Sequence, residues 1–496
     1  MIANAYFWYT PAAIRGKVRD VFMAVLRGQF SSKLGFILAS AGSAVGIGNL
    51  VGFPVMASKN GGGAFLFIYL LFIAFVCFPV MLAEIAMGRA SQSSPVGAFN
   101  SLSGNNRVWR TVGGLGIITP FFIAVFYAVI TVWILIYLVQ SAIGNLDMLA
   151  NPETFGATVG SPVMFAYLAP LLGVLFYILG KGVNDGIERA ATILMPTLII
   201  MMILLIGFVL TLDNAFAGVS FYLVPEFSKI DSGVINSALN HGFFSLSLGM
   251  GILITYGSYL NKKEKIVSST RLVAIADTGV AFFAGLLVIP AVFAIDPGVN
   301  ADELSESSIS LMFSYLPQIF LSLQEFVGYF GASLVAFMFF TLVFFAALTS
   351  LVSITEIPIA YVMDEKDKPR REAVVYVGLA VTVFALVTTV SFGMSDFFTS
   401  FLHYGGINKS FFDLIYDVFY ETILPLMGFI VCLFVCYRWK KHSMNEEVGL
   451  EDENFHGSLL QKYVGFSLGT FIPLILLAVF LNNVSRIYFA HNLFGF

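Results

Sequence analysis

Charged residues are scarce in this sequence. Only 11% of its 496 residues are Asp, Glu, Lys or Arg, whereas 58% are hydrophobic and 52 are Phe. A soluble globular protein carries about a quarter charged residues, so the composition indicates a polytopic membrane protein. Cysteine is also rare: Cys77, Cys432 and Cys436 all lie in apolar runs. A disulfide framework is therefore not expected.

The N-terminus lacks the features of a cleavable signal peptide. Residues 1–10 (MIANAYFWYT) have neither a basic n-region nor a clean apolar core. Residues 12–30 are basic and amphipathic, which fits an interfacial helix on the inner leaflet and fits a solvated tail as well. We expect residues 1–30 to form a cytoplasmic N-terminal segment.

Long apolar runs occupy most of the remaining chain. Eleven of them reach the ~20 residues that a bilayer-spanning helix needs. The expected spans are 33–57, 62–88, 115–144, 163–180, 187–212, 233–260, 270–295, 327–361, 371–392, 409–439 and 459–482. The fold class that follows is an all-α polytopic membrane protein with eleven transmembrane helices.

The 26 Lys and Arg are divided unevenly between the two sets of loops. With the N-terminus in the cytoplasm, only Lys59, Lys229, Lys409 and Arg486 lie outside. The positive-inside rule selects this orientation, and the acidic segment 296–306 (DPGVNADELSE) is consistent with an outer position. The C-terminus is then extracytoplasmic.

Two of the expected spans contain helix-breaking residues. Residues 42–54 read GSAVGIGNLVGFP and residues 242–251 read GFFSLSLGMG, each deep in an apolar run. Glycine and proline suit a helix interior least, and lipid offers no water to satisfy a broken backbone. Small residues can also simply let helices pack closely. A matched pair of breaks favours an inverted-repeat transporter with its site at the membrane midplane.

Each break opens one half of the chain, which predicts a 5+5 inverted-repeat core with two discontinuous helices. Unwound carbonyls can coordinate a cation, and half-helix N-termini can bind a carboxylate. The expected parts are a first repeat at 31–230, a second repeat at 231–440, a cytoplasmic loop at 441–458, and the eleventh span with the extracellular C-terminus at 459–496.

Six segments in order along the chain carry a resemblance to a known family. They are KLGFILASAGSAVGIGNLVGFP, NGGGAFLFIY, EIAMGR, GIERAATILMPTL, FFSLSLGMGILITYGSY and LTSLVSITEIPIAYVMDE. From Arg27 to the tenth span the chain resembles the neurotransmitter:sodium symporter family, and eleven spans resemble many of its bacterial members. The resemblance implies a transporter, not an enzyme. It would carry zwitterionic, apolar or aromatic amino acids with sodium, by alternating access across a bacterial inner (plasma) membrane.

The resemblance further implies two sodium sites built from oxygen ligands. Site one would comprise Ala44, Asn49, Ser245 and Asp277 with the substrate's own carboxylate, and site two Gly42, Val45, Ala346, Thr349 and Ser350. Oxygen ligands suit a hard alkali cation, and no His/Cys cluster suggests a transition metal. Taken alone, Thr349 and Ser350 would be expected to bond back to their own helix.

Asp277 departs from the Asn that many members carry at this position. Those members need another negative charge, from chloride or from a glutamate one turn onward, where this sequence has Ala281. An acid within a span costs at least ~2.5–3.5 kcal/mol on insertion scales and marks a functional site by default. We expect Asp277 to supply the charge, so that chloride is not needed. The alternative is a protonated Asp satisfied by neighbouring hydroxyls.

The substrate pocket implied by the resemblance is mostly apolar. It comprises Ser43, Ala44, Ile47, Gly48, Ile123, Tyr127, Phe244, Ser247, Met250, Ser350 and Ile354. Tyr127 can donate to a carboxylate, and no acid is placed to hold a basic side chain, which fits a zwitterion with an apolar side chain. Many members carry Phe where this chain has Met250, and its flexible thioether should also admit aromatic side chains.

The cytoplasmic gate of the family is matched and the external gate is not. The matching inner residues are Arg27, Phe30, Ser258, Tyr259 and Asp364. Outside, Gly52 stands at the position of the usual arginine and Tyr416 at that of its acidic partner, with Asp413 and Asp417 flanking Tyr416. Loss of both charges together is physically reasonable, because removing one alone would leave the other unpaired in a region of low dielectric.

Three further polar residues lie within apolar runs. Glu84 resembles a glutamate that accepts hydrogen bonds from unwound backbone, whereas Glu356 has no role that the sequence assigns. His241 should lie near the outer vestibule, as a weak polar closure or as an ordinary hydrogen-bonded histidine. Other function classes are a channel, which would pass current without organic substrate, and a non-transporting receptor or assembly subunit. The expected partners are a small-molecule amino acid and the lipid bilayer, with no nucleic acid.

Overall fold

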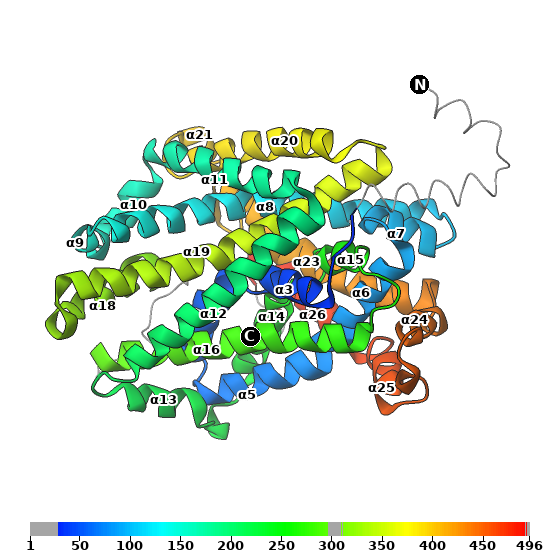
Figure 1. Cartoon of the computed structure of the whole chain (residues 1–496), viewed down its shortest axis with the longest axis horizontal. Coiled ribbons are helices and arrows are strands. Elements are labelled where there is room, and N and C mark those ends of the chain that lie inside the picture. The colour runs from blue at the N-terminus through cyan, green and yellow to red at the C-terminus, as the bar shows by residue number, and fades with distance from the viewer. Residues whose placement is uncertain (1–27, 296–308, 310, 492, 494–496) are drawn as a thin grey trace.

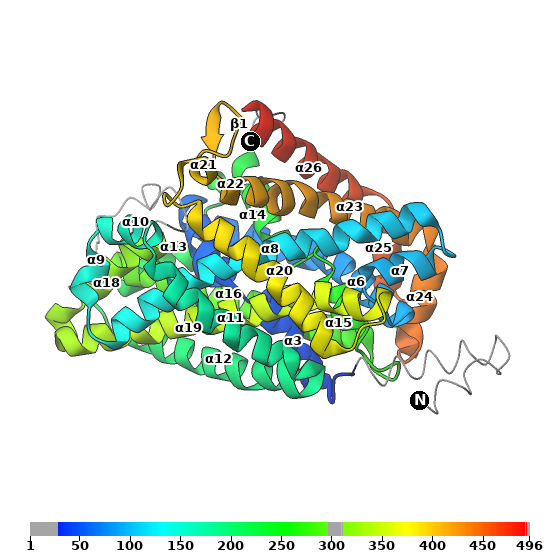
Figure 2. The ribbon, with the colours of Figure 1, turned by 90° about the horizontal axis from the view of Figure 1, so that it is seen from above.

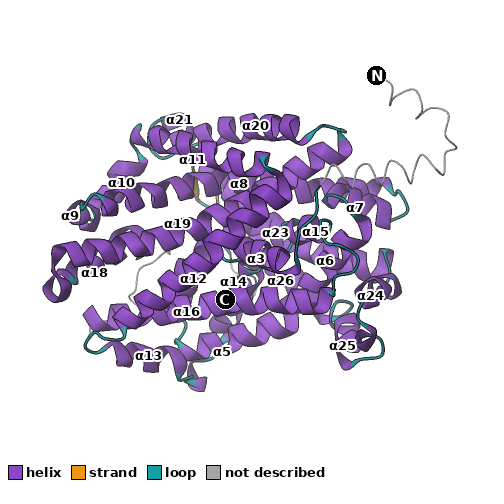
Figure 3. Ribbon diagram, viewed as in Figure 1, coloured by secondary structure: helices purple, strands orange, loops and turns teal. Residues whose placement is uncertain are grey.

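The computed structural model describes residues 28–295, 309, 311–491 and 493, and nearly all of the regular structure there is helical (Figure 3). One antiparallel hairpin joins β1 (Leu402–Tyr404) to β2 (Ile407–Lys409). The expectation of an all-α protein is confirmed. The basic segment up to Arg27 and the acidic segment 296–306 lie outside the described residues.

Within the described residues, nine helices are long and apolar enough to cross a membrane. Five are single elements: α8 (Arg107–Ala142), α11 (Val163–Gly180), α16 (Ile266–Ile295), α19 (Gln324–Glu365) and α20 (Arg370–Val390). Of these, α19 is kinked near its start at Gly328, which has φ +71° and ψ 166°. The other four are composite: α5 (Gly63–Phe72), η2 (Ile73–Cys77) and α6 (Phe78–Ser91); η3 (Val183–Glu188) and α12 (Arg189–Val209); α22 (Phe411–Ile415), η7 (Tyr416–Ile423), α23 (Leu424–Leu433) and η8 (Phe434–Arg438); α25 (Leu459–Ser467) and α26 (Phe471–Phe489).

Both expected helix breaks are present. The first span divides into α3 (Lys33–Ala44) and the pair η1 (Gly48–Gly52) and α4 (Phe53–Lys59), bent by 56°. At the expected sixth span, α14 (Ser232–Ser245) and α15 (Ile252–Gly257) are separated by non-helical residues 246–251. The bent first span makes a tenth crossing. Because α14 and α15 are each too short to count as a span, eleven crossings stay a prediction.

The second break is fixed by backbone conformations that only glycine adopts easily. Gly249 and Gly251 both have φ +77°, and Ser247 has φ +55°. A Cβ atom added at Gly249 would lie 2.6 Å from the carbonyl oxygen of Leu424. The amide of Gly249 donates instead to Glu84 Oε1 at 2.8 Å, inside the protein. Residue 249 therefore has to be glycine, and the sixth span cannot continue as a helix through it.

Some span boundaries differ from the prediction because tertiary packing extends the helices. The third span begins at Arg107 rather than at residue 115, since Asn106 caps it by accepting from the amide of Val108 at 2.9 Å. Trp109 in its first turns packs on Phe434, with ring centroids 4.9 Å apart. The last span continues to Phe489 rather than ending at residue 482.

The broken first span lies at the centre of the bundle. α3 packs on α12, α16 and α19, and α8 and α19 run side by side as the most extensive helix pair (Figures 1 and 2). Short helices that the sequence analysis did not predict lie at the two ends (Figure 1). Those at the predicted outer end are α9 (Leu146–Ala150), α10 (Glu153–Val159), α13 (Ala215–Leu223), η4 (Phe227–Lys229), η6 (Leu311–Tyr315), α18 (Leu316–Ser322) and α21 (Asp396–Thr399). At the predicted inner end lie α7 (Pro95–Leu102), α24 (Lys441–Gly449) and η9 (Glu453–Phe455).

Candidate sodium and substrate site

A cavity of about 790 Å³ lies against both helix breaks. Every residue of the expected substrate pocket lines it, from Ser43 on the first span to Ile354 on α19. The cavity continues past them to residues at the predicted outer end, including Ile309, Asp413 and Arg486. Residues that are hundreds of positions apart in the sequence thus share one space that opens towards the outer end.

Aromatic rings from three helices form one wall of the cavity. Phe244 of α14 stacks on Tyr420 of η7 with centroids 4.8 Å apart. Phe126 of α8 contacts Tyr416 edge to face at 5.4 Å. The sequence analysis placed only Phe244 in this wall. The aromatic side chains at 416 and 420 are spaced one helical turn apart, but nothing in the sequence shows which helix faces them.

The hydroxyl of Tyr127 is held at the first break. Its oxygen accepts a hydrogen bond from the backbone amide of Ile47 at 3.3 Å. A Cβ atom at Gly46 would lie 2.8 Å from this oxygen and 3.0 Å from the Ser350 hydroxyl. Glycine at position 46 therefore lets both hydroxyls approach the unwound backbone. Because Tyr127 accepts from Ile47, its own proton is available to a carboxylate in the cavity.

The side chains expected at sodium site one meet in the protein interior. Asn49 Nδ2 donates to Ser245 Oγ at 2.9 Å and to Asp277 Oδ1 at 2.7 Å. Ser245 Oγ in turn donates to Asp277 Oδ2 at 2.9 Å. Asp277 is fully buried, and these donors compensate its carboxyl group. For Asn49 to bind a cation here, its amide would have to rotate so that Oδ1, which now accepts from the amide of Gly46 at 3.1 Å, faces the ion.

The oxygens expected at sodium site two converge between α3 and α19. Ser350 Oγ lies 3.4 Å from the carbonyl oxygen of Gly42 and 3.2 Å from that of Val45. Thr349 bonds back to its own helix, with its hydroxyl 3.0 Å from the carbonyl oxygen of Ala346. The back-bonding alternative thus describes Thr349 in this structure. Ser350 instead reaches across to the broken helix.

Comparison with known proteins places this arrangement in a family. The model of the sodium:neurotransmitter symporter family matches residues 27–155 and 158–492. The chain belongs to this family. The resemblance read from the sequence motifs is therefore confirmed, and the protein is a multi-pass membrane transporter of a sodium-coupled family.

Several relatives of the symporter span nearly its whole length. The uncharacterized sodium-dependent transporter YhdH of Bacillus subtilis (strain 168) is 33% identical over 470 residues, 93% of this chain and 98% of the relative. An uncharacterized sodium-dependent transporter of Haemophilus influenzae is 30% identical and covers 92% of this chain and 98% of its own length. The crystal structure of MhsT in complex with L-phenylalanine is 36% identical, with a TM-score of 0.76, and covers 92% of this chain and 99% of MhsT.

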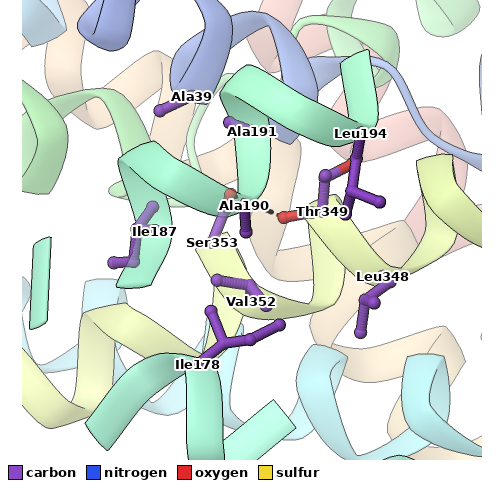
Figure 4. A pocket seen from close by; sticks show the side chains of 10 residues that line it. All are labelled: Ala39, Ile178, Ile187, Ala190, Ala191, Leu194, Leu348, Thr349, Val352 and Ser353. Atoms are coloured by element: carbon purple, nitrogen blue, oxygen red, sulfur yellow. Dashed lines mark hydrogen bonds between the residues drawn. The ribbon is translucent and has the colours of Figure 1, made fainter. Parts of the chain in front are cut away.

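The symporter is closely packed on the inner side of Thr349. A pocket of only about 10 Å³ remains there, between α3, α12 and α19. Figure 4 shows the Thr349 and Ser353 hydroxyls at its edge, opposite Ala190 and Ala191. A space of this size holds about one water molecule. The large cavity thus reaches the predicted outer end, whereas only this small pocket lies beside Thr349 on its other side.

Polar contacts of the expected cytoplasmic gate lie below this pocket. Asp364 accepts from the backbone amide of Ser94 at 2.7 Å, and Ser258 donates to the carbonyl oxygen of Thr255 at 2.6 Å. Phe30 donates its amide to the carbonyl oxygen of Tyr259 at 3.3 Å. Arg27, the expected partner of Asp364, lies outside the described residues.

Glu356 forms a buried ion pair that the sequence analysis did not assign. Its carboxylate is fully buried and accepts from Arg370 Nη2 at 2.6 Å and from Arg370 Nη1 at 3.0 Å. The Tyr259 hydroxyl donates to the same carboxylate at 2.7 Å. Arg370 Nε also donates to the carbonyl oxygen of Leu179 at 2.7 Å. The network joins α19, α20, α11 and the residues that follow α15.

Proposed function

We propose that this symporter carries zwitterionic amino acids with apolar or aromatic side chains into a bacterial cell by alternating access. The observation that carries the proposal is one cavity that brings the expected substrate residues to both helix breaks, beside Asn49 and Ser245. The apolar wall suits an aliphatic or aromatic side chain. The Tyr127 hydroxyl and the unwound backbone at Ile47 and Gly48 suit a carboxylate.

Two sodium ions accompany each substrate in this proposal. The first is coordinated by Asn49, Ser245, Asp277 and the carbonyl of Ala44, together with the substrate carboxylate. The second is coordinated by the carbonyls of Gly42, Val45 and Ala346 and by the hydroxyls of Thr349 and Ser350. Chloride is not required, because the Asp277 carboxylate supplies the negative charge.

The substrate class is supported by the aromatic wall and by MhsT, whose crystal structure holds L-phenylalanine. Met250 lines the cavity and is buried beside the second break. A thioether at this place accommodates side chains of different shape more readily than a rigid ring does. The proposal therefore includes aromatic amino acids beside aliphatic ones.

The proposed topology follows the distribution of basic residues. The protein lies in the bacterial inner membrane with a cytoplasmic N-terminus, eleven spans and an extracytoplasmic C-terminus. Residues 31–230 and 231–440 form the two inverted repeats. In this orientation the 790 Å³ cavity faces outward, which corresponds to the step of the cycle that receives substrate.

The test is uptake of a radiolabelled amino-acid panel into proteoliposomes that contain the purified full-length protein. We expect saturable uptake of Phe, Trp, Leu and Ile that requires inward sodium, and little uptake of Lys or Glu. Equal uptake with choline in place of sodium on both sides would contradict sodium coupling. Large sodium currents without any amino acid would favour the channel instead.

A further inference from the structure

The outer end of the cavity holds ion pairs in place of the one that the family resemblance predicts. Gly52 and Tyr416 stand at the positions of the usual charged pair, and both line the cavity. Arg486 of α26 pairs with Glu421 of η7 at 3.2 Å. Lys409 of β2 lies 2.9 Å from an Asp417 carboxylate oxygen. Among the described residues that line the cavity, Arg486 is the only Lys or Arg.

The last span holds Glu421 at two points. Asn483 Nδ2 donates to the backbone carbonyl of Glu421 at 2.8 Å, and Arg486 Nη2 contacts the Glu421 carboxylate. Glu421 lies in the π-helical segment η7, whose wider turns are frequent at functional sites. The eleventh span, which lies outside the proposed repeats, therefore fixes the position of an acid at the mouth of the cavity.

Arg486 retains donors for a further contact. Its side chain is 51% exposed, whereas that of Glu421 is 18% exposed. A guanidinium group has five N–H donors in a planar fork, and the pair with Glu421 uses only one side of it. The cation is thus neutralised by Glu421 and still able to donate into the cavity.

The part of the mouth that α14 forms carries an acceptor to which no described residue donates. α14 contributes Asn236, Ser237, Asn240 and His241 to the cavity lining. Asn240 Nδ2 donates to Asn236 Oδ1 at 3.2 Å. Within the described residues, no donor reaches Asn240 Oδ1, although this atom is buried. A buried amide oxygen without a donor is unfavourable, so a state of the protein that supplies one is stabilised.

The two walls have largely different neighbours. α14 packs mainly on α5, η1, η2 and α4, whereas α26 packs mainly on η7 and α23. The walls already touch where Phe244 of α14 stacks on Tyr420 of η7, and we infer that a closing movement would narrow the part of the cavity that still separates α14 from α26. The Arg486 guanidinium on one wall and the Asn240 amide oxygen on the other, to which no described residue donates, are complementary as donor and acceptor.

We propose that Arg486 is the cationic half of the external gate and that Asn240 is its neutral partner. On this proposal, which rests on the proposed transport function, closing the mouth over a bound amino acid brings the guanidinium to Asn240 Oδ1. The pair with Glu421 persists through the movement. A neutral acceptor fits this role, because a second buried carboxylate would need its own compensation.

The gate is tested by the accessibility of a cysteine placed inside the mouth. The three native cysteines, Cys77, Cys432 and Cys436, are buried, which keeps background labelling low. Ile130 of α8 lines the cavity, and Ile130→Cys in the full-length protein provides the target. Labelling by a membrane-impermeant methanethiosulfonate reagent is measured in sodium, with and without L-phenylalanine.

We expect phenylalanine to slow labelling of the Ile130→Cys protein. When Arg486→Gln is added, phenylalanine should slow labelling about tenfold less than in the Ile130→Cys protein, a factor that corresponds to ~1.4 kcal/mol. Asn240→Leu, which leaves the ion pair with Glu421 intact, should have the same effect, and Arg486→Lys should retain part of the protection. Dissociation of radiolabelled phenylalanine should accelerate in parallel.

The matched control is Lys229→Gln, which removes a cation at the predicted outer end that pairs with Glu226 and does not line the cavity. Phenylalanine should protect the Lys229→Gln variant from labelling as well as it protects the Ile130→Cys protein. Full protection in both Arg486→Gln and Asn240→Leu would overturn the gate. If Arg486→Gln no longer binds phenylalanine, the Asn240→Leu variant alone tests the gate: unchanged protection in that variant would overturn it. Absence of protection in the parent itself would instead contradict the proposed function, since there the substrate fails to bind.

Discussion

The hydroxyl of Ser350 lies 3.1 Å from the backbone carbonyl oxygen of Ser43 and joins α19 to the broken first span. Both residues are buried. The hydroxyl stands among carbonyls whose helical partners are missing because the helix stops at Ala44. A sodium ion among the same oxygens would take over this bridging role with full positive charge. The contact therefore links ion binding to the position of α3.

We expect Ser350→Ala to raise the half-saturating sodium concentration for uptake about tenfold, because a ligand worth ~1.4 kcal/mol is lost. Thr355→Val is the matched control: Thr355 is buried in the same helix and bonds only back to the carbonyl of Leu351 at 2.7 Å within the described structure. Its sodium dependence should match the wild type. Initial uptake rates measured over a range of sodium concentrations give the half-saturating concentration for each variant. An unchanged titration for Ser350→Ala would remove this residue from the ion site.

Met250→Phe should change substrate choice. Met250 is 5% exposed and lines the cavity beside the second break, so a rigid ring there takes space from the substrate side chain. We expect Trp and Phe to lose ~1–3 kcal/mol of binding relative to Ala, the usual cost of overpacking. Competition against a radiolabelled substrate measures the ratio. Met56→Phe, at a position that lines the same cavity but is not among the expected substrate residues, should leave the ratio unchanged. Identical profiles for both variants would place Met250 outside the pocket.

The two helix breaks could be predicted from the sequence because their chemistry is local: glycine and small polar residues occur where a helix cannot continue. The side chains around each break were predicted from the resemblance of the motifs to the family. Glu356 and Arg370 show the opposite case. They lie 14 positions apart and meet only because α19 ends and α20 turns back beside it. No periodic pattern in the sequence encodes that turn.

The outer end was harder to predict for the same reason. Arg486 lies in the last span, 65 positions after Glu421, and its place at the cavity depends on how α26 packs against η7. Tyr416 and Tyr420 carry a helical spacing, but the facing helix that turns them into a wall is α8 or α14. Tertiary packing, rather than residue type, decides these contacts.

The effects of Glu356 and Arg370 on the free energy of unfolding should depend strongly on each other. Arg370→Ala leaves a fully buried carboxylate with the Tyr259 hydroxyl but no cation beside it, and we expect it to reduce the free energy of unfolding by about 3–5 kcal/mol. Glu356→Gln combined with Arg370→Gln should lose less than Arg370→Ala alone. Lys368→Ala is the control, since its pair with Glu372 is exposed to solvent and should contribute little to stability. Thermal unfolding in detergent ranks the variants, and equal losses for Arg370→Ala and Lys368→Ala would contradict a buried pair.

Transport should be independent of chloride, and Asp277 should be the reason. Its carboxylate is fully buried and receives donors only from Asn49 and Ser245 among the described side chains. A sodium ion beside it would be compensated by a fixed charge in a region of low dielectric, where charge balance is worth several kcal/mol. Ala281, one turn onward in α16, is also buried and offers no charge. A second anion at this place is therefore not required.

Wild-type uptake should be the same in chloride and in gluconate. Asp277→Asn keeps the shape of the side chain while removing the charge and one of the two acceptor oxygens that Asn49 and Ser245 use, so we expect it to lose most sodium-dependent uptake. Combining it with Ala281→Ser adds a hydroxyl donor where an anion would bind, and activity should then return only when chloride is present. Ala281→Ser alone is the control, since with Asp277 intact it should transport in either anion. A chloride requirement in the wild type, or normal transport by Asp277→Asn in gluconate, would show that the Asp277 charge is structural and that sodium at this site is balanced by another group.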